Sequence, residues 1–161
     1  DFVDRALQME PGRWRDRFGF ALRTSLEVLG PHRDSLAALT PVLLGESDTA
    51  VLGAGSRASR DQVQRVFEVA VAEARDAPRA AVAHALGRLL YVTHLLVILW
   101  WLLDKSPGQR STATLLEKIE SLASWLALSL RLPGAKGFLL SVDVLVRQGL
   151  LGETVAAGEE A

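Results

Sequence analysis

The sequence predicts an all-α fold, a multi-helix bundle around a buried central helix at about residues 79–105. Three observations lead to this prediction. Residues 89–103 read LLYVTHLLVILWWLL and contain no Asp, Glu, Lys or Arg. Segments on either side repeat large apolar residues every three or four positions, the period of an amphipathic helix. We find no convincing strand pattern.

Large apolar side chains cover the whole circumference of the predicted central helix. Such a helix belongs in a protein core or in a lipid bilayer. A membrane span needs about 20 uninterrupted apolar residues, whereas Arg88 and Asp104 bound a shorter run here and Thr93 and His94 interrupt it. We therefore expect a core helix and no membrane partner.

Glycine, proline and capping residues divide the remaining chain into helices. Gly–Pro and Pro–Gly pairs favour helix ends and helix starts. Two Ser-x-x-Gln patterns, at 59–62 and 106–109, match the capping box and predict helix starts at Ser59 and just after Ser106. The predicted helices are 1–9, 13–29, 31–39, 40–45, 59–75, 79–105, 107–130 and 135–148.

Two segments lack any helical period. Residues 46–58 (ESDTAVLGAGSRA) are small and polar, so we expect a mobile loop. The chain ends in the acidic run GETVAAGEEA, and we expect residues 151–161 to be a disordered tail. The length of 161 residues fits a single domain, which we place at residues 11–150.

Composition excludes several classes of protein. The net charge of −1 gives no general attraction for nucleic acid. The absence of cysteine rules out disulfides and thiolate metal sites, and we expect a cytoplasmic protein. The first residues are amphipathic and charged, unlike a signal peptide.

Catalytic motifs are absent. The sequence has no Gly-x-Ser-x-Gly elbow, phosphate-binding glycine loop or His-Glu-x-x-His pair, so we expect neither an enzyme nor a bound cofactor. His84 and His94 are separated by about 15 Å along one helix at 1.5 Å per residue. One metal ion cannot bridge that distance, and we predict no metal site.

Polar residues inside the central helix are the candidates for ligand binding. Tyr91 and His94 are either core residues with satisfied polar atoms or the anchors of a cavity. Arg88 either makes an ion pair or joins them. A cavity would lie between the central helix and the helices at 13–29 and 59–75. The candidate ligand-binding residues are Phe18, Leu22, Phe67, Arg88, Tyr91, His94 and Trp101.

An apolar stripe on the helix that follows residue 106 raises the question of self-association. The stripe comprises Leu115, Ile119, Leu122, Leu126 and Leu130. A single subunit can use it internally. Together with the central helix, however, it offers more apolar surface than one subunit needs to cover. We therefore expect a homodimer in which two helices per subunit form a four-helix bundle.

The order of these features resembles a known family. The run HLLVILWWLLDKSPGQRSTATLLEKIESLASWLALSLRLPG, residues 94–134, resembles the C-terminal region of tetracycline-repressor-like (TetR/AcrR) transcriptional regulators. SLEVLGPHRDSLAALTPVLL, residues 25–44, is similar to the middle helices of the same domain. Residues 1–10 look like the end of the helix that connects this domain to a DNA-binding head.

The resemblance implies a regulator that dimerises and responds to a small, mainly apolar effector. The family's DNA-binding helix-turn-helix is not among these 161 residues, so DNA would be a partner only through a separate N-terminal domain. An alternative with a similar fold is a helical carrier of lipids or isoprenoids. The resemblance does not identify the effector.

Overall fold

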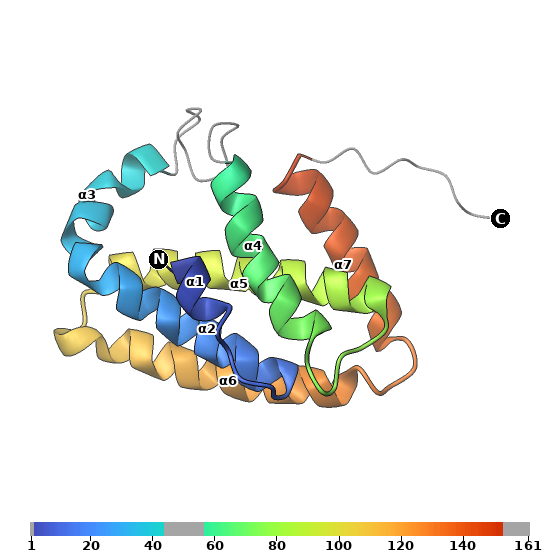
Figure 1. The fold of residues 1–161 in the computed structure, drawn as a ribbon. Helices are drawn as coiled ribbons and strands as arrows, with labels where there is room; N and C mark the ends of the chain where they lie inside the picture. Colours follow the sequence, from blue (N-terminus) through green and yellow to red (C-terminus); the bar gives the residue numbers. More distant parts are fainter. Residues whose placement is uncertain (1, 44–56, 153–161) are drawn as a thin grey trace.

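The computed structural model describes residues 2–43 and 57–152, and these ranges contain helices and no strand (Figure 1). The predicted all-α fold is therefore confirmed. Most of the predicted loop at 46–58 lies outside the described residues, as does the predicted tail from residue 153 onward. The elements in chain order are α1 (Phe2–Ala6), α2 (Trp14–Leu29), η1 (Gly30–His32), α3 (Arg33–Leu43), α4 (Arg57–Ala72), α5 (Ala80–Leu103), η3 (Pro107–Gln109), α6 (Arg110–Ser129) and α7 (Ala135–Gly149).

Helix α5 is the central element, and it contacts α2, α3, α4, α6 and α7. Figure 1 shows α4 crossing α5 steeply, while α6 runs beneath α2 along the lower edge of the molecule. The core combines the inner faces of α2, α4 and α5, where large side chains such as Phe18, Val66 and Leu86 are fully buried. The prediction of a central helix at about 79–105 agrees with α5.

One face of α5 remains open to solvent in the single subunit. Leu96, Trp100 and Leu103 are 61%, 49% and 59% exposed. Among the described residues, α5 is long and apolar enough to cross a membrane, a property that core helices of soluble proteins share. One apolar face of α5 is thus buried in the core, and the other apolar face is exposed on the surface of the single subunit.

One helix start and one helix break differ from the predictions. Helix α3 continues through Pro41, where we predicted two short helices. Pro41 removes one helical hydrogen bond, the one to the carbonyl four residues earlier, and α3 ends two residues after it. Helix α4 begins at Arg57, which places Ser59 inside the first turn instead of before it. The first N–H groups of a helix lack helical partners whichever residue begins it. A capping pattern in the sequence therefore shows that a helix begins nearby but does not determine the first helical residue.

The turn between α5 and α6 is organised by Asp104. Its carboxylate accepts hydrogen bonds from the Ser106 N–H at 2.8 Å and from the Thr112 hydroxyl and N–H at 2.6 and 2.9 Å. The hydrogen bonds from Thr112 and Ser106 hold the pKa of the Asp104 carboxyl well below its usual value. The predicted capping box is wrong in detail, because the Ser106 hydroxyl accepts from Ser111 N–H and the Gln109 side chain binds Trp101.

The C-terminal end of α5 is capped from a distant helix. The Arg33 guanidinium on α3 donates to the carbonyl oxygens of Trp101 and Asp104 at 3.0 and 2.8 Å. Carbonyls at a helix end lack helical partners and carry a partial negative charge, so a cation satisfies both demands. The same guanidinium lies 5.7 Å from the Trp101 ring centroid. Arg33 thereby holds α3 against α5.

Candidate functional site

Aromatic rings from four helices, α1, α2, α4 and α5, gather around His94. Phe67 on α4 lies 4.9 Å from the His94 ring, centroid to centroid, and Tyr91 lies 6.5 Å from it. Phe18 on α2 meets Phe67 edge to face at 6.0 Å. Phe2 on α1 stacks on His94 at 5.8 Å with the two planes only 6° apart. These five residues define the aromatic cluster.

Within this cluster, His94 has one satisfied and one unsatisfied nitrogen. Its Nε2 lies 2.8 Å from the Ser25 hydroxyl on α2. Its Nδ1 is buried and has no hydrogen-bond partner among the described residues. Burial disfavours the imidazolium and lowers the pKa of His94 to about 4, so the ring is neutral near pH 7. An unpaired buried polar atom among apolar rings is unusual, and it offers one directional contact to a bound molecule.

The Tyr91 hydroxyl adds a second polar atom to the cluster. Burial raises the pKa of the Tyr91 phenol above its ordinary value, so this side chain is neutral as well. A group of neutral hydrogen-bonding atoms set in aromatic walls suits an uncharged, largely apolar molecule. The five residues of the cluster carry no charge themselves, although Arg60 and Asp61 lie close enough to act on the Tyr91 phenol.

The structure places the predicted ligand-binding residues in three locations. Phe18, Phe67, Tyr91 and His94 meet in the aromatic cluster, and Leu22 is buried in the same core. Two residues lie elsewhere. Arg88 binds both carboxylate oxygens of Asp143 on α7, at 2.7 and 3.0 Å. Trp101 is packed under Arg33, with its Nε1–H donating to Gln109.

Two members of this site were not predicted from the sequence. Ser25 falls on the apolar stripe of α2, and a polar residue on a buried stripe is the signal that would have pointed to it. Phe2 carries no comparable signal, because its contact with His94 joins residues 92 positions apart. Local periodicity cannot reveal such a contact.

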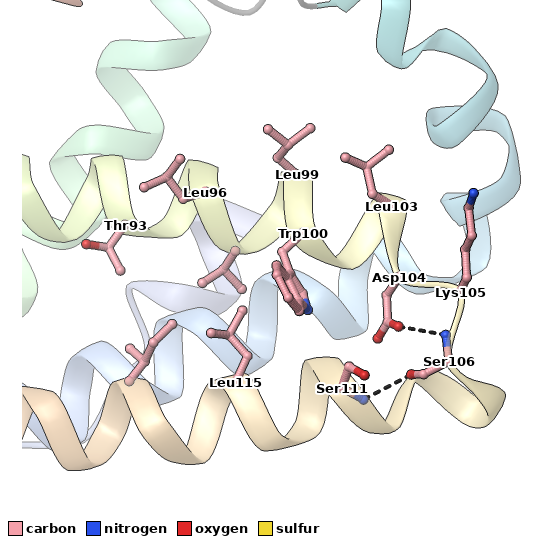
Figure 2. Close-up of a pocket in the computed structure, with 12 residues that line it drawn as sticks. Thr93, Leu96, Leu99, Trp100, Leu103, Asp104, Lys105, Ser106, Ser111 and Leu115 are labelled. Atoms are coloured by element: carbon pink, nitrogen blue, oxygen red, sulfur yellow. Dashed lines mark hydrogen bonds between the residues drawn. The ribbon is translucent and has the colours of Figure 1, made fainter.

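A second feature is an open apolar groove of about 760 Å³ between α5 and α6. Figure 2 shows Trp100 directed from α5 toward α6, where Leu115 points back at it. Asp104, Lys105 and Ser106 close one end of the groove. The walls are otherwise almost entirely leucine, isoleucine, valine and tryptophan, so the groove presents apolar surface to solvent.

The predicted interface stripe is divided between this groove and the core. Leu115 and Ile119 line the groove, and Leu122 is 66% exposed. Leu126 packs partly against the core, while Leu130 is only 7% exposed and belongs to the core of its own subunit. Helix α6 turns small residues such as Ala123 inward, which leaves large ones on its outer side.

Glu120 on α6 forms an ion pair with Arg23 on α2. The face of α6 that carries Glu120 is therefore directed toward α2 and not only toward solvent.

Comparison with known proteins identifies the family. The family model described as tetracyclin repressor-like, C-terminal domain, matches residues 17–128. The match covers well over half of the chain and runs from α2 almost to the end of α6. No curated protein matches the sequence. The helical architecture, the central α5 and this match agree, and the chain belongs to the tetracycline-repressor-like C-terminal domain family.

Proposed function

We propose that this chain is the effector-binding and dimerisation body of a tetracycline-repressor-like transcriptional regulator. The family assignment supports a regulatory role rather than an enzymatic one. The observation that carries the effector-binding part is the aromatic cluster, in which the buried Nδ1 of His94 has no partner within the described chain. In this proposal DNA is read by a helix-turn-helix that precedes Asp1, and reading the coding sequence upstream of that residue tests this part directly.

The effector in this proposal is a small, neutral, mainly apolar molecule. Phe18, Leu22 and Phe67 supply apolar walls, and Tyr91 and His94 supply hydrogen bonds. Arg88 is left out because its guanidinium is committed to Asp143. An effector favours one arrangement of the subunits only to the extent that it binds that arrangement more tightly.

A compound screen by thermal shift tests effector binding. Neutral aromatic compounds are expected to raise the melting temperature of the wild-type chain. Tyr91→Phe and His94→Leu should weaken the shift, since each removes a polar atom of the site. His84→Gln is the matched control, because His84 is an exposed residue on the same helix. If no neutral aromatic compound stabilises the wild type, or if His94→Leu leaves every shift unchanged, the aromatic cluster is not the effector site.

The dimerisation part of the proposal rests on the groove between α5 and α6. In the single subunit, Trp100, Leu103 and Leu122 are about half or more exposed. Patches of this kind mark interaction sites in soluble proteins. We propose that a second copy covers the groove, with α5 and α6 of each subunit forming the predicted four-helix bundle.

A further inference from the structure

We propose that Ser25 determines which class of molecule the aromatic cluster accepts: its hydroxyl holds His94 in the tautomer with the proton on Nδ1, so the site selects molecules that present a hydrogen-bond acceptor. The inference rests on the proposed effector-binding function and names the chemical class of the effector, an apolar aromatic ketone, ester or nitrile. Ser25 acts through the histidine ring and is therefore a positioning residue.

The Ser25 hydroxyl is directed at His94. Ser25 is 2% exposed, and within the described part of the chain its Oγ has one hydrogen bond, the 2.8 Å contact with His94 Nε2. Hydroxyls inside helices often donate to the carbonyl four residues earlier, as Thr40, Thr93 and Ser124 do here. Ser25 makes no such bond among the described residues, so the acceptor for its proton is His94.

The balance of donors and acceptors then fixes the tautomer of His94. A neutral imidazole has one N–H donor and one nitrogen acceptor, and the hydrogen bond at one nitrogen decides which is which. If Ser25 donates to Nε2, the proton lies on Nδ1, and one buried group, the Nδ1–H, lacks a partner in the described structure. If Nε2 donates to Ser25 instead, two buried groups lack partners, the Ser25 proton and the Nδ1 lone pair. Each unsatisfied buried group lowers stability, so the first arrangement is favoured.

An unpaired Nδ1–H makes the aromatic cluster selective. It can pair with a carbonyl oxygen or a nitrile nitrogen of a bound molecule, whereas a molecule with only a donor leaves it unsatisfied. The Tyr91 phenol does not make this distinction, because a phenol hydroxyl both donates and accepts. The preference for acceptors therefore comes from His94, and the orientation of the His94 donor comes from Ser25.

The tautomer can be measured without a ligand. Long-range 1H–15N NMR spectra of the full chain at neutral pH distinguish protonated from unprotonated ring nitrogens, and His94→Leu identifies the His94 signals among the three histidines. We expect the His94 proton on Nδ1 in the wild type and in Ser25→Thr, which keeps a hydroxyl. Ser25→Ala should move part of the proton to Nε2, because Nε2 then no longer accepts a hydrogen bond. The control Ser124→Ala, which removes an exposed hydroxyl on α6, should leave the His94 signals unchanged.

Two pairs of probes with matched shapes test the selectivity by calorimetric titration of the full chain. Acetophenone and α-methylstyrene differ only in a carbonyl oxygen against a CH2 group, and the wild type should bind acetophenone about tenfold more tightly. Indole and indene differ in a ring N–H against a CH2 group, and the wild type should not prefer indole. Ser25→Ala should reduce the first preference and create the second, a reversal that a loss of packing alone does not produce. Ser124→Ala should keep both wild-type results.

The inference is overturned if His94 carries its proton on Nε2 in the wild type, if the wild type binds acetophenone no more tightly than α-methylstyrene, or if Ser25→Ala keeps the wild-type preferences. Any of these results can accompany a positive compound screen, in which case the effector site stands and the role of Ser25 does not. A screen that finds no neutral aromatic binder rejects the effector site, and the inference with it.

Discussion

His94 combines a structural hydrogen bond with the polar atom on which the proposed effector site depends. Ser25 fixes one ring nitrogen from α2, while apolar rings surround the other. The other ring nitrogen, Nδ1, is therefore buried without a hydrogen-bond partner in the described part of the chain. An unsatisfied buried polar atom costs about 1–3 kcal/mol of stability, which a hydrogen bond with the proposed effector would recover.

The charge state of His94 makes stability depend on pH. Its pKa is about 4 in the folded chain, against 6.5 as the ordinary value, so the unfolded chain binds the proton more readily. The free energy of unfolding should fall by about 3 kcal/mol as pH falls from 6.5 toward 4. Urea denaturation across this range measures it. His94→Gln should flatten the curve relative to the wild type, whereas the exposed control His84→Gln should not; equal slopes in all three proteins would contradict the assignment.

At the level of residues, the sequence predicted the buried rings of the aromatic cluster better than the polar contacts of the cluster. Phe18 and Phe67 were predictable because helical period alone places them on inner faces. For His94, the expectation of a core residue with a satisfied polar atom is confirmed for Nε2 and not for Nδ1. The ion-pair interpretation of Arg88 is confirmed, but its partner lies 55 residues away and no local pattern points to it.

The crossing of α4 and α5 depends on a glycine. A Cβ atom on Gly87 would lie 2.8 Å from the Glu68 Cα, so the two backbones meet where only hydrogen can fit. Helices that touch at such a point cannot be spread by a larger side chain without repacking both faces.

Gly87→Ala should therefore destabilise the chain although alanine is the better helix former. Helix propensity favours alanine by about 1 kcal/mol, while overpacking against a backbone costs about 1–3 kcal/mol. We expect a net loss, measured by urea denaturation. Gly137→Ala is the control on α7, where no described atom lies within 4 Å of the place that a Cβ would take, and it should be neutral or stabilising. A higher unfolding free energy in Gly87→Ala than in the wild type would show that α4 can shift away from α5 without a cost.

Two arginine–carboxylate pairs of similar chemistry differ in burial. Asp143 is 5% exposed where it holds Arg88, and truncating one partner of a buried pair costs about 3–5 kcal/mol. Glu120 meets Arg23 at the surface, with both side chains 40% or more exposed, and such pairs contribute about 0–1 kcal/mol. Asp143→Ala should thus lower the unfolding free energy far more than Glu120→Ala. Similar losses of unfolding free energy in the two variants would mean that burial does not determine how much the Arg88–Asp143 pair stabilises the packing of α7.

At the level of elements, most helices were predictable because their apolar period and their glycine and proline boundaries are local. The inward face of α6 was predicted less well. Large leucines suggested one stripe, but the core accepts Thr112 and Ala123, whose small side chains let α6 approach closely. The capping of α5 by Arg33 depends on the tertiary fold and leaves no trace in either segment.

At the scale of the whole molecule, the open groove between α5 and α6 predicts a dimer. Light scattering should give twice the 17.4 kDa of one chain, with an interface above about 1,200 Å² in total. Leu96→Glu with Leu122→Glu should yield a folded monomer, because both side chains are more than 60% exposed in the subunit. Leu39→Glu, an exposed leucine on α3 away from the groove, should remain dimeric. A wild-type mass of 17.4 kDa at micromolar concentration would refute the dimer.

The Arg88–Asp143 pair also bears on where this domain can be cut. The family match ends at residue 128, yet Asp143 reaches back from α7 to bind a guanidinium inside the matched segment. A truncation or a chimaera designed at the family boundary would delete the carboxylate and uncover the side of α5 that α7 packs against. The segment that matches the family is thus shorter than the segment that packs as one folded unit. Chimaeras between regulators of this family should therefore include α7 together with α2–α6.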